Sequence, residues 1–156
     1  LGLARTYYGQ RMNALRHEAL PYEFKSGGWV AKAETDPDLH LGAAGVVSSP
    51  ADLVRFMDAL LAGKVVSPTS LESMRGTSEI SLGLPLTELA GRKAYGYSGR
   101  IDEYRASVYH FPDSGISVSY ATNAFVLPPD ELLNEVLALI FDRGRRPPSL
   151  EPVQPP

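Results

Sequence analysis

The sequence predicts three helices, and the first and third of them have the apolar spacing of amphipathic helices. The first begins with Ser49 as N-cap and Pro50 at the first helical position, and Gly63 ends it. A second Ser-Pro pair opens a shorter helix over about 68–75, and two prolines precede a third helix over about 129–142. Apolar residues that recur every three or four positions give the first and third helices an apolar face. These faces comprise Leu53, Phe56, Met57, Leu60 and Leu61, and Leu132, Leu133, Val136, Leu137, Ile140 and Phe141.

Between the second and third helices, the apolar period changes toward two, which is typical of strands. We predict strands near 80–88, 93–100, 105–111 and 116–122, joined in part by the turn sequences "LAGR" and "PDSG". They are expected to form one antiparallel sheet, with the helix at about 129–142 packed on it. Helices followed by antiparallel strands and a final helix define an α+β fold.

The two ends of the chain lack such periodicity. Residues 1–48 contain many breakers and are expected to form a long irregular stretch, which is usually a functional loop or part of something larger. The proline-rich end predicts a disordered tail. We therefore divide the chain into a loop and helical segment (1–76), antiparallel strands with the C-terminal helix (77–145), and a tail (146–156).

Composition narrows the possible functions. The chain has 156 residues, of which 44% are hydrophobic and 21% charged, and this is globular composition. A net charge of -3 gives no basic field for nucleic acid. The absence of cysteine excludes disulfides and thiolate chemistry. No stretch is long and apolar enough to span a membrane, and the start is not a signal peptide.

Ser98 is the first candidate for chemistry. It stands in Gly-Tyr-Ser-Gly-Arg, whereas a nucleophile elbow needs Gly-x-Ser-x-Gly, so Arg100 occupies the place of the last glycine. From these residues alone, Ser98 is either a strand serine beside a glycine kink or a serine that holds something that another residue attacks.

The histidines do not indicate a metal site. His17, His40 and His110 show neither HExxH nor His-x-x-x-His spacing. Asp36, Asp38 and His40 lie close together in "DPDLH", but such a loop is more often polar surface. His110 is expected to be solvated or hydrogen-bonded within the fold. We predict no metal and no cofactor.

Three stretches resemble one family in order along the chain. "LGLARTYY" is similar to "PLG(L/M)xxT", and "GAAGVVSSPADLVRFMDALLAGKVVSPTSLESM" is similar to a loop and helix pair, "AAGGxxSTxxDLxRFxxALLxGxxLSPxSLxxM". "YGYSGRIDEYRASVYHFPDSGISVSYATN" is similar to "YGHSGxxxGYxSxxxxxPxxGxxVxxxTN". The chain thus resembles the class C β-lactamase-like serine hydrolases, which include D-alanyl-D-alanine carboxypeptidases and related esterases and amidohydrolases. The resemblance spans Leu1 to about Asp142.

The resemblance implies three motifs, of which the chain contains one. The family has a nucleophile in Ser-x-x-Lys, a second motif Tyr-x-Asn, and a third motif Lys/His-Ser/Thr-Gly on a strand at the edge of the site. The third is present as Tyr97-Ser98-Gly99, whereas neither Ser-x-x-Lys nor Tyr-x-Asn occurs. In the family, both missing motifs lie upstream of the "LGL" segment. The chain therefore resembles the C-terminal part of the β-lactamase/transpeptidase-like fold.

The resemblance also implies roles for four residues. Ser98 would bind the carboxylate or carbonyl side of a substrate, and Gly99 would let the substrate approach the strand. The backbone N–H of Arg100 would be one of two oxyanion-hole donors. Tyr97 departs from the family's Lys or His and carries no positive charge at neutral pH, although a phenol can donate a hydrogen bond.

Three functional hypotheses follow. The first is a C-terminal fragment of a serine hydrolase for a small amide or ester, which is inactive alone because it lacks the nucleophile. The alternative is a non-catalytic binding or structural module; a weaker one is a subunit that associates with a separate N-terminal chain. The isolated chain is expected to self-associate or to pair with the missing N-terminal half, with Leu132, Val136 and Ile140 contributing. The family is often periplasmic or secreted, but the sequence does not predict a compartment.

Overall fold

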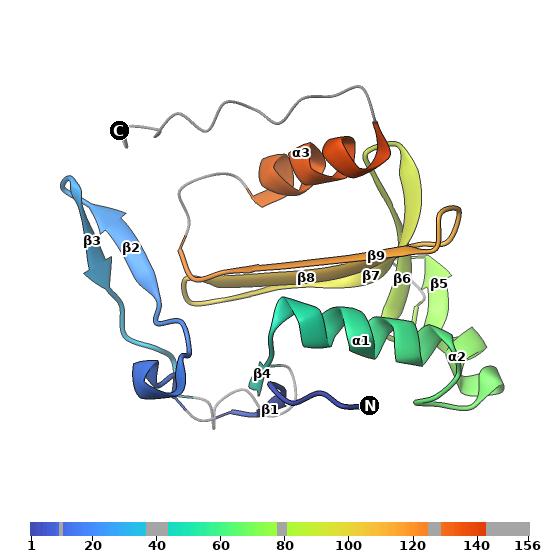
Figure 1. Cartoon of the computed structure of the whole chain (residues 1–156), viewed down its shortest axis with the longest axis horizontal. Coiled ribbons are helices and arrows are strands. Elements are labelled where there is room, and N and C mark those ends of the chain that lie inside the picture. Colours follow the sequence, from blue (N-terminus) through green and yellow to red (C-terminus); the bar gives the residue numbers. More distant parts are fainter. Residues whose placement is uncertain (10, 37–43, 78–80, 125–128, 143–156) are drawn as a thin grey trace.

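A mixed sheet between two layers of helices forms the centre of the molecule. The structure is a computed structural model that describes residues 1–9, 11–36, 44–77, 81–124 and 129–142. Its five-stranded sheet has the order β5-β6-β7-β8-β9. Figure 1 shows α3 on one face of the sheet and α1 on the other. This arrangement confirms the predicted α+β class.

Four of the five strands are those predicted from the apolar alternation. They form an antiparallel meander: β6 (Leu84–Leu89), β7 (Arg92–Ile101), β8 (Tyr104–Phe111) and β9 (Ile116–Thr122). The first begins later than expected, and residues 78–80 lie outside the described residues. The sequence did not predict β5 (Arg75–Thr77), which pairs with β6 in parallel. Three residues are too few to show the two-residue apolar alternation of a strand, so the sequence carries no signal for β5.

The three helices occur where the sequence predicts them. They are α1 (Pro50–Leu61), α2 (Pro68–Met74) and α3 (Pro129–Phe141). The Ser49 hydroxyl accepts a hydrogen bond from the Asp52 N–H at 3.3 Å, and Ser67 caps α2 in the same way. Just after α1, Gly63 adopts a φ of 70°, the left-handed conformation that commonly terminates helices.

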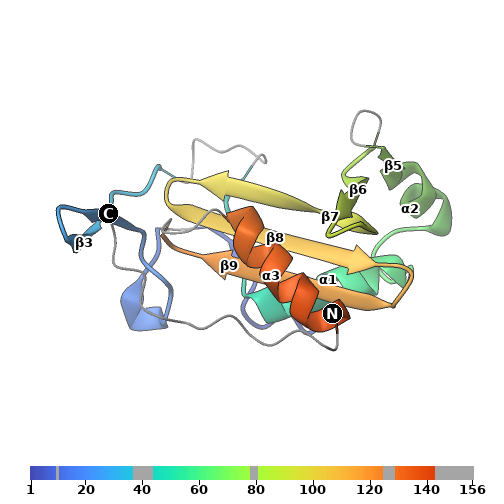
Figure 2. The ribbon, with the colours of Figure 1, turned by 90° about the horizontal axis from the view of Figure 1, so that it is seen from above.

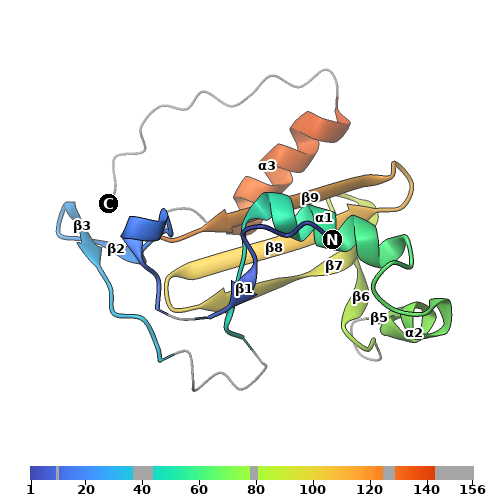
Figure 3. The same cartoon turned by 60° about the horizontal axis from the view of Figure 1, so that its bottom comes forward.

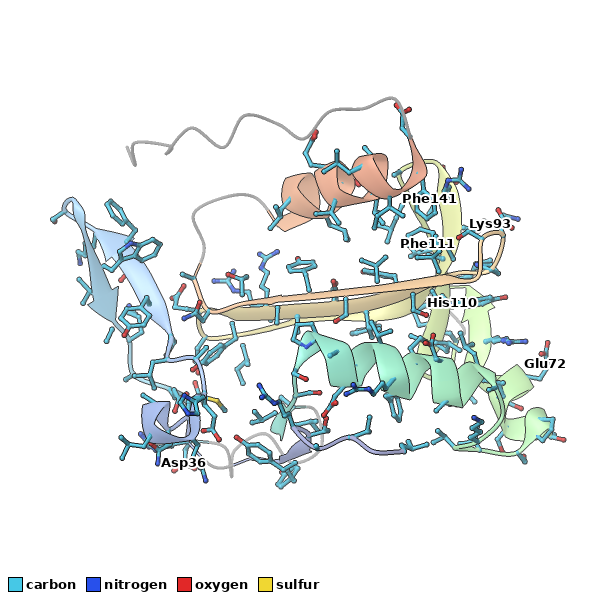
Figure 4. The ribbon with its side chains drawn as sticks, in the orientation of Figure 1. Asp36, Glu72, Lys93, His110, Phe111 and Phe141 are labelled. Atoms are coloured by element: carbon cyan, nitrogen blue, oxygen red, sulfur yellow. The ribbon has the colours of Figure 1, made fainter. Side chains whose placement is uncertain are left out.

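One core lies between α3 and the sheet. Its buried residues are Ala94, Tyr109, Phe111, Leu133 and Leu137. Phe141 meets Phe111 edge-on with the ring centroids 4.9 Å apart, and Figure 4 shows the two rings between helix and sheet. The predicted apolar face of α3 is wider than the surface that the sheet covers. Its remaining residues, Leu132, Val136 and Ile140, are 44%, 37% and 38% exposed.

A second core lies on the opposite face. Met57 and Leu60 of α1, Leu71 of α2 and Leu84 of β6 are buried together. Figure 3 shows α1 and α2 along this side of the sheet. These residues come from both sides of residue 76, so α1 and α2 pack with β6 in one core.

The expectation of an irregular stretch over residues 1–48 was wrong for several short elements. These are β1 (Tyr7–Tyr8) paired with β4 (Val46–Val47), the single turn η1 (Ala14–Arg16), and the hairpin of β2 (Tyr22–Lys25) with β3 (Gly28–Ala31). The hairpin strands lack an alternating buried face, and their aromatic contact is a Phe24–Trp29 edge pair with the ring centroids 5.2 Å apart, so their periodicity is weak. Asp38, His40 and the predicted tail lie outside the described residues.

Candidate functional site

The outer edge of β7 becomes open partway along the strand. β6 pairs with β7 only between Arg92 and Tyr95, whereas β8 pairs with β7 as far as Ile101. Among the strands that the structure describes, none pairs with this edge of β7 beyond Tyr95. Figure 2 shows β7 extending past β6 at this side of the sheet. An open strand edge presents backbone donors and acceptors to any extended molecule that reaches it.

Gly96 lies where β7 separates from β6, and the packing there requires a glycine. A Cβ atom at this position would lie 2.1 Å from the Val108 carbonyl oxygen and 2.8 Å from the Tyr109 Cα. Both are backbone atoms of β8, which cannot move aside without disturbing the ladder. The glycine therefore lets β7 lie close against β8 just before the open edge begins.

The register determines which peptide groups face outward. Ile101 and Tyr104 pair across a two-residue turn, and such a closing pair is hydrogen-bonded. The direction of N–H and C=O groups alternates along an antiparallel strand, so Ile101 and Gly99 direct theirs toward β8. Ser98 and Arg100 consequently direct theirs toward the open edge. At the other end of β7, Leu89 and Arg92 close a two-residue turn in the same way. Alternation counted from this pair also directs the peptide groups of Ser98 and Arg100 toward the open edge.

The four residues singled out from the sequence lie together on this edge. Tyr97 is 67% exposed, and Ser98, Gly99 and Arg100 are also exposed. Ala94 lies in the α3 core and Tyr95 packs against the α1 core, so strand alternation places the Ser98 side chain on the α3 face and that of Tyr97 on the α1 face. A Cβ atom at Gly99 would meet nothing within 4 Å, so the space beside this residue is open.

Ser107 is a polar residue near the edge that the sequence analysis missed. It is the register partner of Ser98 on β8 and is 2% exposed. Its hydroxyl has no hydrogen-bond partner in the part of the chain that the structure describes. The only sequence signal was its position opposite Ser98 in a hairpin, which becomes visible once the turn at 102–103 is known.

His110 belongs to a polar link away from this edge, between the sheet and α1. Ser117 donates its hydroxyl hydrogen to Asp58 Oδ1 at 2.5 Å, so it accepts from the Nδ1–H of His110 at 2.9 Å. Figure 4 shows His110 on the α1 side of the sheet. In a catalytic triad the histidine lies between the acid and the serine, whereas here Ser117 lies between Asp58 and His110. Ser117 is therefore not oriented as a nucleophile that a histidine activates. The expectation of a hydrogen-bonded histidine is confirmed.

This link predicts a pH dependence of stability. Burial is the main cause that lowers the pKa of His110 below its ordinary value. The negative charge of Asp58 opposes this lowering, and the positive charge of Arg75 adds to it. The unfolded chain then binds the proton more readily, so the free energy of unfolding should decrease as the pH falls below about 6.5. Urea titrations between pH 8 and 5 should show a smaller decrease for His110→Gln. An equal decrease in both proteins would contradict the prediction.

The described residues give no sign of a metal centre or a membrane segment. Within those ranges, no group of three or more His, Asp or Glu side chains is placed to hold a metal ion. Likewise, no helix among them has the length and apolarity to cross a membrane.

Comparison with known proteins identifies the class to which this fold and edge belong. The family model described as beta-lactamase matches residues 1–142. The chain therefore belongs to the beta-lactamase family of serine hydrolases. No curated protein matches the sequence significantly.

Solved structures of similar fold are longer than this chain. D-amino acid amidase from Ochrobactrum anthropi SV3, complexed with L-phenylalanine amide, superposes with a TM-score of 0.74 at 21% identity, over 92% of this chain and 48% of the amidase. The octameric penicillin-binding protein homologue from Pyrococcus abyssi gives 0.67 at 22% identity, over 94% and 35%. FmtA from Staphylococcus aureus gives 0.69 at 16% identity, over 90% and 39%. The chain thus spans half or less of these proteins, and at such identities the likeness concerns the fold.

Proposed function

We propose that this chain supplies the substrate-binding strand and one oxyanion-hole donor of a serine hydrolase that forms and hydrolyses an acyl-enzyme from an amide or ester. The observation that carries the proposal is the open edge of β7, where the peptide groups of Ser98 and Arg100 point away from β8. This edge bears the third family motif, at the position from which a backbone N–H can reach a bound carbonyl oxygen.

Each residue of the edge has a role that its position supports. The outward N–H of Arg100 stabilises the negative charge that develops on the carbonyl oxygen in the transition state. Ser98 binds the carboxylate or carbonyl side of the substrate through its hydroxyl. The open space at Gly99 admits the substrate to the strand, and exposed Tyr97 lines the approach with a hydrogen-bonding phenol.

The nucleophile of this reaction has to come from elsewhere. The sequence has no Ser-x-x-Lys and no Tyr-x-Asn. The chain alone is therefore expected to be inactive. The amidase among the similar structures was solved with an amino-acid amide, which supports an amide as the first substrate class to assay.

The proposal predicts a specific effect of removing one backbone hydrogen. Arg100→Pro deletes the N–H, whereas Arg100→Ala keeps it and removes only the side chain. In the full-length protein, assayed with an amide or ester reporter, Arg100→Pro should lower kcat about 10²–10³-fold and Arg100→Ala far less. Equal losses in the two variants would show that the side chain, rather than the N–H, matters.

Gly99→Pro provides a matched control that does not depend on activity. The N–H of Gly99 points toward β8, so a proline there removes a ladder hydrogen bond. Thermal melts of the chain should show a clear loss of stability for Gly99→Pro and a small one for Arg100→Pro. The reverse order would contradict the orientation of the edge.

A non-catalytic module with the same fold is the second candidate. It is favoured by Tyr97, which stands where the family has Lys or His and therefore removes a positive charge from the motif. A full-length protein that carries the motif strand without a Ser-x-x-Lys upstream would support this candidate. Reaction with a fluorophosphonate probe at a serine outside residues 1–156 would support the hydrolase.

We also propose that the chain pairs with a second polypeptide segment, either its N-terminal counterpart or another copy of itself. The apolar residues that α3 leaves exposed support this pairing, as does β9, which pairs only with β8 among the described strands of the sheet. The similar structures contain about twice the length of this chain or more. One of them is described as octameric, which supports self-association as one form of the pairing.

A further inference from the structure

Residues 12–35, here called the arm, are attached to the sheet by several hydrogen bonds, and Pro21 is the one buried residue of the arm. The arm contains η1 and the β2–β3 hairpin, which extends to one side of the sheet in Figure 3. Across the described chain, neither of the two buried apolar clusters includes an arm residue. Trp29 and Val30 of the hairpin are 53% and 48% exposed. Hydrogen bonds to the sheet therefore help to determine where the arm lies.

Two of these attachments are made by residues at the turn that follows the open edge. Asp102 accepts hydrogen bonds from the backbone N–H of Thr35 at 2.8 Å and from the Thr35 hydroxyl at 2.7 Å. The hydroxyl of Tyr104 lies 2.7 Å from Glu34 Oε1 and 3.0 Å from the Ala19 carbonyl oxygen, both within reach of its hydrogen. We call these contacts the turn clamp.

The turn clamp is continued inside the arm and at the end of β9. The second oxygen of Glu34 accepts from the Met12 N–H at 2.9 Å, so one carboxylate ties the start of the arm to the turn. Asn123 donates its side-chain amide to the Leu20 carbonyl oxygen at 2.6 Å, and its backbone carbonyl oxygen accepts from the Tyr22 N–H at 2.9 Å. The arm thus bridges the end of β9 and the β7–β8 turn.

The end of β7 needs such a restraint. Beyond Tyr95, β7 is the edge strand of a three-stranded region, with β8 as its only described neighbour and β9 on the far side of β8. The end of an edge strand has a partner on one side only, so it opens locally more readily than a central strand. The turn itself holds Asp102 at a φ of 49°, a conformation that a non-glycine residue adopts at some cost. Burial raises the pKa of Tyr104, and the hydrogen bond to Glu34 adds to this effect. The Tyr104 hydroxyl therefore keeps its hydrogen and remains the donor in the turn clamp.

From this geometry, we propose that Asp102 and Tyr104 are positioning residues. By fastening the β7–β8 turn to the arm, they hold the last residues of β7 on β8 and so fix the direction of the Ser98 and Arg100 peptide groups. The positional part of this inference stands on the contacts alone. Its consequence for catalysis rests on the proposed function.

Amide hydrogen exchange on the chain tests the positional part. Gly99 and Ile101 direct their N–H groups toward β8, so their exchange reports opening of this strand end, and Tyr95 reports the other end of the same ladder. Asp102→Asn weakens the acceptor while keeping a residue that tolerates positive φ. Tyr104→Phe removes the hydroxyl. Each should accelerate exchange at Gly99 and Ile101 about five- to tenfold, the factor expected from one lost hydrogen bond, and leave Tyr95 unchanged.

Glu23→Gln is the matched control, because it removes a charge from the arm without touching the turn. Glu23 pairs with Lys32 at 2.9 Å across the hairpin. Exchange at Gly99 and Ile101 in this variant should equal that of the wild type. Unchanged exchange in Asp102→Asn and Tyr104→Phe would overturn the proposal. An equal acceleration at Tyr95 would also overturn it, because the contacts would then serve general stability.

The catalytic consequence has a separate test in the full-length protein. Tyr104→Phe should lower kcat about tenfold with little change in KM, because a displaced N–H weakens transition-state binding more than substrate binding. Thr35→Val, which removes the hydroxyl from the other side of the clamp, should act in the same direction. Accelerated exchange with an unchanged kcat would refute the catalytic part alone. A wild-type protein without activity would refute the proposed function and leave the exchange result intact.

Discussion

An Asp52→Ala variant should melt about 10 °C or more below the wild-type chain, because three separate hydrogen bonds end on this one carboxylate. Asp52 lies in the first turn of α1 and is 1% exposed. Its oxygens accept from the Arg5 N–H at 2.7 Å, the Thr6 hydroxyl at 3.0 Å and the Arg55 guanidinium at 2.9 Å. Alanine would leave the N-terminal segment without its attachment to α1.

The same carboxylate should make stability depend on acid. The hydrogen bond from the Arg5 backbone is the largest cause that lowers the pKa of Asp52, with Thr6 and Arg55 adding to it. A lowered carboxyl pKa contributes stability above the unfolded value near 3.9, and this contribution is lost as the pH falls toward the folded value. Melting curves between pH 6 and 3 should therefore converge for the wild type and Asp52→Ala.

Arg55→Ala is the control for the Asp52 prediction. The Arg55 side chain is 59% exposed, and an ion pair to an exposed partner contributes little. This variant should melt within a few degrees of the wild type. Melting temperatures that fall equally in Arg55→Ala and Asp52→Ala would show that the ion pair, rather than the attachment of residues 5 and 6, carries the effect.

The sequence predicted the elements whose signals are local. Ser49 and Ser67 begin helices because a serine followed by proline suits the N-cap and first helical positions, and the structure has both helices there. The four antiparallel strands are long enough to show alternation. In contrast, the hydrogen bond between Thr6 and Asp52 joins residues 46 positions apart, and no periodicity encodes such a contact.

The candidate site was predicted as a run of residues but not as a geometry. The motif Tyr97-Ser98-Gly99 could be located from its resemblance to a family, and the structure places these residues on one open edge. The direction of each peptide group depends on the register set by the turns at 90–91 and 102–103. The clamp between Asp102 and Thr35 depends on an arm of exposed, weakly periodic residues. Both features arise from tertiary pairing, which propensity and spacing do not report.

The isolated chain should associate rather than remain monomeric. Leu132, Val136 and Ile140 are spaced by four residues, so they form one exposed apolar stripe along α3. In the described part of the sheet, the outer edges of β9 and of the end of β7 are also without a strand partner. Exposed edges and contiguous apolar surfaces favour contact with other chains. Light scattering should give a mass above 16.9 kDa that rises with concentration.

Substituting the stripe separates its contribution from that of the strand edges. The triple variant Leu132→Gln, Val136→Gln and Ile140→Gln should shift the chain toward the monomer, because it replaces the apolar contact and leaves the buried residues of α3 in place. Leu15→Gln is a matched control, since Leu15 is 90% exposed and lies in η1, away from the stripe. It should leave the mass unchanged. A compact wild-type monomer at every concentration, with cooperative unfolding, would show that these 156 residues close their own core and need no partner.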